Sequence, residues 1–302
     1  MQRIRRSPLK KQQDRWGLLF AVPALIFFSV FSFYPILSAL WTGFTNKQAL
    51  SLERPKFVGL ANYVYLLQSA DFWNSMRATA VFTLGTFSAL VLLSLLLSAL
   101  VSGLHRGKKF YQLAYYSPAV LSSVVAATIW LLIFDPRGLA NQAVGAVMNT
   151  PGVDYDWFIN PFMEQLSTML VYFWKYIGYF VIICIAGMAS IPASIYEATR
   201  LDGATKWQTY WRITFPLLRP TVLLVSVMSM LQCLRTFSVQ YLFTLGGAPL
   251  AAINVITLNI YFTGIRYYRI GRASAMSIIL LIIMVVLTWV QFRGSRTDEV
   301  TY

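Results

Sequence analysis

The chain has 302 residues, of which 57% are hydrophobic and only 12% are charged. This composition excludes an ordinary soluble domain. The net charge of +14 would favour nucleic acid as a partner of a soluble protein, but the Lys and Arg residues here flank long apolar runs, so nucleic-acid binding is not expected.

Apolar runs of about 20 residues, the length needed to cross a bilayer, occur six times. Backbone polar groups in hydrocarbon must be satisfied within their own segment, so each run is predicted to be a helix. We therefore expect an all-α polytopic membrane protein with six transmembrane helices in a single domain over residues 1–302. The runs lie at about 16–40, 78–100, 113–134, 166–189, 221–242 and 273–292.

The distribution of cations predicts the orientation. Fifteen Lys and Arg residues lie before the first run or in the loops that share its side, against eight in the other loops. The positive-inside rule therefore places both termini and the loop 190–220 in the cytoplasm. The first run is too long for a signal peptide and no small-residue cleavage site follows it, so we expect an uncleaved first helix.

Two outer segments are long enough to carry structure. In 41–76, Asn62 is predicted to cap an interfacial helix with an apolar face that includes Tyr63 and Leu66. The segment 135–165 is net acidic, and we expect a solvated loop; contact with an extracellular partner protein is the alternative. Its charged residues are Asp135, Asp154, Asp156 and Glu164, against Arg137.

Two cations fall inside predicted spans, Lys175 in the fourth and Arg235 in the fifth. At a helix centre each would cost roughly 2.5–3.5 kcal/mol, so neither should face lipid. One interpretation is that they snorkel outward or pair with the acidic outer loop. The other is that they edge a water-filled substrate pathway.

Polar side chains near these cations favour the pathway. Hydroxyl-rich ligands such as sugars are held by amides, hydroxyls and aromatic faces, and Gly178 would leave space beside them. The alternative is that the same side chains bond neighbouring helices together. The candidates are Tyr176, Tyr179, Ser229, Gln232, Cys233, Thr236 and Gln240.

The cytoplasmic loop 190–220 has the pattern of two short helices. Ser194 with Glu197 and Thr205 with Gln208 are predicted capping boxes, and Gly203 is expected to take a positive φ between them. Ile195, Ala198 and Leu201 would offer an apolar docking face. Pro216 and Pro220 are expected to end the second helix and help start the next.

Several kinds of chemistry have no matching pattern. The closest string to a phosphate-binding loop, at 103–109, has one residue too few between its glycines and lacks the final hydroxyl. His105 is the only histidine, so neither a metal set nor a Ser/His/Asp triad is expected. All eleven carboxylates lie outside the six predicted spans, which argues against a proton-coupled carrier and puts the energy source on another subunit.

The loop also resembles the EAA loop of binding-protein-dependent ABC importer permeases. Thr199 and Phe215 depart mildly from that pattern, and the sugar-permease branch, of the maltose and glycerol-phosphate type, fits best. The matching residues here are Glu197, Ala198, Asp202, Gly203, Ala204, Ile213, Pro216 and Pro220. Further matches are Phe57, Gly59, Asn62, Tyr63, Thr244, Gly246, Gly247, Pro249, Ile260, Tyr261, Gly271, Ala273 and Ala275. The segment 249–265 is then expected to form a helix at the outer rim instead of a seventh span.

The resemblance implies a MetI-like permease in the inner membrane of a bacterium, which translocates a sugar, oligosaccharide, glycoside or related polyol. It implies a transport subunit and not an enzyme, with no cofactor of its own. Its partners would be a second homologous permease, two ATP-binding subunits that hold ATP and Mg²⁺, and an extracytoplasmic solute-binding protein. The ATPase would be contacted by Glu197, Ala198, Arg200, Asp202, Gly203 and Ala204. A secondary carrier, or an enzyme acting on a lipid-linked substrate, are the alternatives.

Overall fold

The structure is a computed structural model that describes residues 8–104, 106–150, 152, 155–246 and 248–294. Asp154, His105 and Gly247 therefore lie outside the described residues. Within these ranges the chain is built from helices, and extended backbone pairs only at an isolated antiparallel bridge between Thr45 and Phe57. The predicted all-α class is confirmed.

In the described part of the chain, five helical segments are long and apolar enough to cross a membrane. A sixth candidate is a bent pair, α5 (Lys108–Val120) and α6 (Ser123–Ile133), whose axes differ by 98°. Counted as one span, this pair completes the expected six. The five segments are Trp16–Thr42, α4 (Ala70–Ser102), α8 (Pro161–Ala189), Arg219–Leu245 and α16 (Ile270–Gly294).

The third run was expected to be one continuous helix over 113–134, and the structure differs there. Pro118 has no N–H to donate to the carbonyl of Ala114, and the hydroxyl of Ser117 donates to that carbonyl instead, at 3.1 Å. α5 then ends, and Ser122 caps α6 by accepting from the N–H of Val125 at 3.2 Å. A proline stop followed by a new cap therefore divides the run.

The first and fifth spans are also irregular. The first consists of α1 (Pro8–Phe28), the π-helix η1 (Ser29–Phe33) and α2 (Tyr34–Thr42). The π turn lies two residues before Pro35, where the proline removes a helical donor. The fifth consists of α12 (Arg219–Leu234) and α13 (Ser238–Leu245), with Arg235 at the break.

The described chain divides into two compact units. The first contains residues up to 68 together with 260–279, and Asn62 holds it together. The prediction that Asn62 caps a helix is wrong, because this residue lies inside α3 (Ala61–Gln68). Its side chain is buried and donates to the carbonyls of Gly43 at 2.9 Å and Thr45 at 2.8 Å. In the same unit the guanidinium of Arg272 lies 3.5 Å from the ring centre of Tyr65.

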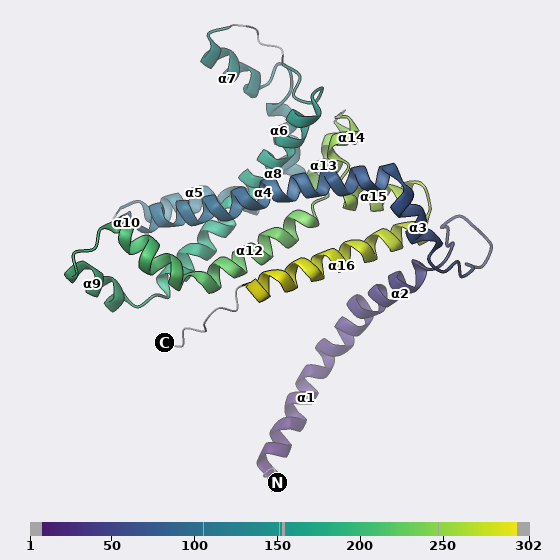
Figure 1. The fold of residues 1–302 in the computed structure, drawn as a ribbon, viewed down its shortest axis with the longest axis horizontal. Coiled ribbons are helices and arrows are strands. Elements are labelled where there is room, and N and C mark those ends of the chain that lie inside the picture. Colours follow the sequence, from purple (N-terminus) through teal and green to yellow (C-terminus); the bar gives the residue numbers. More distant parts are fainter. Residues whose placement is uncertain (1–7, 105, 151, 153–154, 247, 295–302) are drawn as a thin grey trace. The chain divides into compact units, whose positions relative to one another are not determined.

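The second unit contains residues 69–259 and those from 280 onward. α4 and α8 pack lengthwise, α5 lies along α8, α12 lies along α4, and α6 packs against α13 (Figure 1). Phe82 and Phe180 are among the largest side chains of its core, and Phe82 meets the ring of Tyr172 edge to face at 5.4 Å. This packing sets the frame for the candidate sites.

Short helices form the remaining segments. The outer segment 135–160 contains α7 (Leu139–Met148). The segment 249–265 is divided into α14 (Leu250–Ile253), α15 (Ile256–Tyr261) and the π-helix η3 (Phe262–Arg266). Each piece is far shorter than a bilayer-crossing helix.

Candidate functional sites

The loop 190–220 is folded as an elbow of two helical arms, residues 193–217. The first arm is α9 (Ala193–Leu201), and the second runs through α10 (Lys206–Thr209), the π-helix η2 (Tyr210–Thr214) and α11 (Phe215–Leu217). Gly203 joins them with φ +71°, as predicted. Both arms lie at one end of the second unit (Figure 1).

One of the two predicted capping boxes is confirmed. The N–H of Gln208 donates to the hydroxyl of Thr205 at 3.3 Å, and the N–H of Thr205 donates to the side chain of Gln208 at 2.9 Å. The predicted box at Ser194 and Glu197 is wrong, because the N-cap of α9 is Pro192, two residues before Ser194.

The expected effect of Pro216 is also corrected. This proline lies inside α11 and does not end the second arm. It follows η2 by two residues, so the missing donor is absorbed by the wider π turn. Pro220 lies in the first turn of α12, as expected.

The first arm exposes most of the residues proposed for docking. Glu197, Ala198, Arg200, Asp202 and Gly203 are exposed, and Ala204 is half-buried. Leu201 is 89% exposed, which is unusual for a leucine that only serves packing. This arm therefore presents a mixed-charge surface with an apolar residue at its end.

The other face of the elbow is attached to the membrane helices. Ile195 was expected in the docking face, but it packs with Tyr196 against a buried cluster of Met188, Ile191 and Leu218. This cluster joins the end of α8, the elbow and the start of α12. Displacement of the elbow would therefore be passed to both helices.

Hydrogen bonds reinforce this attachment. The hydroxyl of Tyr210 donates to the carbonyl of Leu95 on α4 at 3.3 Å. The hydroxyl of Thr214 donates to that of Tyr196 at 3.4 Å, which connects the two arms directly.

Lys175 follows neither of the two interpretations offered for it. Its side chain is only 3% exposed, and its ammonium donates to the carbonyls of Leu121 and, at 3.5 Å, Ala119. These carbonyls belong to the C-terminal end of α5, where helical carbonyls have no intrahelical donor. Lys175 thus caps the broken third span, and among the described residues of the segment 135–165 none is bonded to it.

Gly178 does not leave space for a ligand, contrary to the prediction. A Cβ atom placed there would lie 1.9 Å from the carbonyl oxygen of Tyr115, so backbone of α5 already fills the position. The neighbouring Tyr176 and Tyr179 are half-buried, and the ring of Tyr176 packs 4.5 Å from that of Tyr172.

The polar candidates on the fifth span recur at steps of three or four residues and form a polar stripe: Ser229, Gln232, Cys233, Thr236 and Gln240. They differ in how far they are buried. Ser229, Cys233, Thr236 and Gln240 are buried. The hydroxyl of Ser229 donates to the carbonyl of Val225 at 2.7 Å, and that of Thr236 donates to the side chain of Gln240 at 2.9 Å. These contacts fit the role of bonding within and between helices.

Gln232 of the stripe and the neighbouring Arg235 are more accessible. Gln232 is half-buried, and its side-chain oxygen has no hydrogen-bond partner among the described residues. Arg235 is exposed at the break between α12 and α13, and its Nε donates to the carbonyl of Leu231 at 3.2 Å. These two are better placed to meet a solute than the buried residues of the stripe.

Glu164 was predicted to lie in a solvated acidic loop, outside the spans, and the structure places it elsewhere. It lies in the first turn of α8, 1% exposed, and both carboxylate oxygens lack a hydrogen-bond partner among the described residues. The helix begins early because Asn160 caps it and Pro161 follows. The carboxylates are therefore not all outside the spans.

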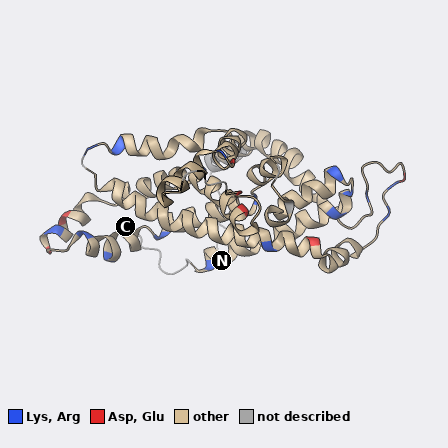
Figure 2. Cartoon of the chain, turned by 90° about the horizontal axis from the view of Figure 1, so that it is seen from above, with Lys and Arg blue, Asp and Glu red and all other residues tan. Residues whose placement is uncertain are grey.

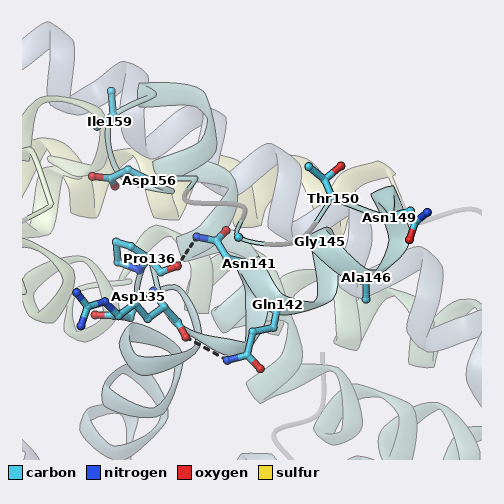
Figure 3. Close-up of a pocket in the computed structure, with 12 residues that line it drawn as sticks. Asp135, Pro136, Asn141, Gln142, Gly145, Ala146, Asn149, Thr150, Asp156 and Ile159 are labelled. Carbon is cyan, nitrogen blue, oxygen red and sulfur yellow. Dashed lines mark hydrogen bonds between the residues drawn. The ribbon is translucent and has the colours of Figure 1, made fainter.

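The side chain of Asn141 makes three hydrogen bonds within the segment 135–160. This role was not predicted from the sequence. The amide nitrogen of Asn141 donates to the carbonyls of Pro136 and Tyr155, both at 2.8 Å, and its oxygen accepts from the indole N–H of Trp157 at 2.9 Å. The two residues joined by the first of these bonds line an open hollow of about 1210 Å³ beside α7 (Figure 3). Asp135, Arg137 and Asp156 line this hollow, so the acidic segment is folded and not merely a solvated loop.

Three comparisons bear on the chain. The family described as "binding-protein-dependent transport system inner membrane component" matches residues 95–293. The sn-glycerol-3-phosphate transport system permease protein UgpA of Agrobacterium fabrum is 31% identical over 276 residues, which are 91% of this chain and 92% of that protein. The lactose transport system permease protein LacF of Rhizobium radiobacter is 29% identical over 96% of this chain and 97% of that protein.

A solved structure shows the same fold. A chain of a bacterial ABC transporter involved in the import of the acidic polysaccharide alginate superposes with a TM-score of 0.81. The match covers 96% of this chain and 99% of that chain at 23% sequence identity. The fold of this chain therefore belongs to a known architecture.

Proposed function

Since the chain belongs to the family of binding-protein-dependent transport system inner membrane components, we propose that it is the permease subunit of an ATP-driven importer for a sugar, oligosaccharide, glycoside or related polyol. It is a transport subunit and not an enzyme. Relatives named for sn-glycerol-3-phosphate and for lactose support a hydroxyl-rich solute.

The observation that carries the mechanism is the two-faced elbow. Its exposed arm offers Glu197, Arg200 and Asp202 to a partner, and its inner face packs on the ends of α8 and α12. Charge-assisted hydrogen bonds to those side chains would hold the arm in a cleft of an ATP-binding subunit. Closure of that subunit on ATP would then tilt α8 and α12 together, which opens the pathway to alternate sides.

The proposed assembly contains a second homologous permease, two ATP-binding subunits that carry ATP and Mg²⁺, and an extracytoplasmic solute-binding protein. A related alginate transporter has been solved in complex with an alginate pentasaccharide-bound periplasmic protein, which supports the last of these. In the inner membrane, both termini and the elbow would face the cytoplasm, in line with the cation distribution.

Within the membrane we assign the solute pathway to Tyr176, Tyr179, Gln232 and Arg235, because these candidates keep accessible surface. Ser229, Cys233, Thr236 and Gln240 are buried and are left out of this assignment. An anionic group on the solute would meet Arg235, since the ammonium of Lys175 is engaged by backbone carbonyls.

The decisive experiment reconstitutes the complete importer and measures solute uptake and ATP hydrolysis together. Glu197→Lys should lower solute-stimulated transport by at least about tenfold, the effect of losing one charge-assisted bond. Gly203→Asp should lower it as well, because a side chain at φ +71° strains the turn between the two arms. Glu53→Lys, a matched reversal of another exposed carboxylate, should leave it unchanged. Normal transport by both elbow variants would refute the coupling role, and uphill uptake by the chain alone would favour a secondary carrier.

A further inference from the structure

The second arm of the elbow carries a row of aromatic rings, which we call the aromatic strip: Trp207 and Trp211, which are exposed, and Phe215, which is half-buried. These residues are spaced by four, and their ring centres are 5.5 Å and 5.3 Å apart along the row. Trp207 is 69% exposed and Trp211 is 45% exposed. Indole rings are seldom left this open to water without a partner surface.

The strip is not needed to attach the arm to its own protein. Tyr210, Thr214 and Leu218 make that attachment, through the contacts with Leu95, with Tyr196 and within the buried cluster. The ring of Tyr210 also meets that of Trp211 edge to face at 5.4 Å, so the attached side borders the strip. The second arm therefore has one side that packs on its own protein. On its other side Trp207 and Trp211 are not covered by the described residues of the second unit.

The charge of the two arms differs sharply. The first arm mixes Glu197, Arg200 and Asp202, whereas the stretch 203–220 contains three cations and no Asp or Glu. Those cations, Lys206, Arg212 and Arg219, are all exposed. Figure 2 shows blue basic residues together with red acidic ones at this end of the second unit, and few charges on the long helices beyond it.

A candidate membrane span, Arg219–Leu245, begins directly after the strip. α12 starts at Arg219, four residues beyond Phe215, and its surface is apolar within two turns, with Leu224 50% exposed. Trp at the headgroup level, beside Lys and Arg that attract anionic lipid, is the composition of helices that lie in a membrane interface. A cleft of an ATP-binding subunit that accepts the mixed charges of the first arm would not match the aromatic and basic surface of the second arm.

We propose that the aromatic strip and its three cations dock on anionic phospholipid headgroups of the inner leaflet. The proposal rests on the cytoplasmic placement of the elbow. The elbow then has two partners: the first arm meets protein and the second arm meets lipid. Lipid contact fixes the position of the elbow at the membrane surface. Force applied to the first arm by the ATP-binding subunit then tilts α8 and α12 instead of displacing the elbow along the surface.

Site-specific photocrosslinking in the complete importer tests this directly. A benzophenone side chain is placed at Trp211 or, as the matched control, at Leu201, in nanodiscs that contain phosphatidylglycerol. Position 211 should yield phospholipid adducts and position 201 adducts with the ATP-binding subunit. Protein adducts at 211, or no adduct with lipid there, would overturn the proposal. Absence of ATPase adducts at 201 would count against the proposed function instead.

The cations provide a second measurement. Lys206→Gln with Arg212→Gln should lower the yield of phosphatidylglycerol adduct at position 211 at least about fivefold, a factor expected for each cation near an anionic surface. Lys109→Gln, an exposed cation elsewhere in the same unit, should leave that yield unchanged. An equal yield with phosphatidylcholine alone would refute the role of charge.

Discussion

At the scale of single residues, Lys175 shows how a membrane helix can be broken and remain satisfied. α5 ends in the middle of the bent pair that forms the sixth candidate span, and its last carbonyls have no donors within the helix. The ammonium of Lys175 supplies donors to Ala119 and Leu121 from the neighbouring helix, and its charge complements the negative end of the helix dipole. The lysine is therefore a positioning residue for the broken span.

Replacement of this lysine should loosen the break. Lys175→Met fills similar volume but leaves buried carbonyls without donors, which costs about 1–3 kcal/mol. We expect a lower midpoint in thermal unfolding of the detergent-solubilised chain and faster hydrogen exchange in 118–125. Lys175→Arg keeps the charge and the donors and should retain most of the stability. Equal stability of the Met variant and the unchanged chain would contradict the capping role.

At the scale of elements, the contact between α5 and α8 depends on one residue without a side chain. Gly178 allows the carbonyl of Tyr115 to approach where a Cβ would stand. This close approach places the end of α5 within reach of Lys175, one turn earlier on α8. The glycine and the lysine therefore act together to hold the third span.

The substitution Gly178→Ala should separate the two helices, because a backbone atom 1.9 Å from the new Cβ cannot move without moving α5. Overpacking of this kind costs about 1–3 kcal/mol. Gly85→Ala is the matched control, since its Cβ would meet only the flexible side chain of Met169 at 3.0 Å. Unfolding midpoints of the two variants in detergent measure the difference, and similar midpoints would show that α5 can yield.

Some element boundaries have local causes in the sequence that the search for apolar runs did not use. Pro118 and Ser122 carry the stop and the start that divide the third run, and Asn160 before Pro161 marks the start of α8. Average hydropathy hides such breaks, since the run stays apolar throughout. Helix placement within the fold was not predictable, so the burial of Glu164 and the hub role of Asn141 appear only in three dimensions.

The candidate sites divide in the same way. The elbow was predictable because its motif combines a glycine, a cap and charges at fixed spacing. The solute pathway was not, since Ser229 and Gln232 lie on one polar stripe yet differ in exposure. A polar residue on a helix satisfies the same pattern whether it faces a neighbour or a cavity. Tertiary packing alone decides between them.

At the scale of the whole molecule, α8 connects the two functional ends of the second unit. Its 29 residues span about 43 Å, enough to cross a bilayer. The segment with α7 and the open hollow precedes its first turn, and the elbow follows its last turn. The two must therefore lie on opposite sides of the membrane, so force applied at the elbow reaches the outer surface along a single helix.

Labelling of single cysteines tests this topology. Cys184 and Cys233 are completely buried, so the unchanged chain should react little with a membrane-impermeant maleimide. In intact spheroplasts Thr150→Cys should be labelled, and Ser194→Cys only after permeabilisation; both positions are exposed. A cysteine appended to the C-terminus should behave like Ser194→Cys, because six spans return the chain to its starting side. If the appended cysteine reacts in intact spheroplasts, the segment 249–265 crosses the membrane after all and the six-span arrangement is wrong.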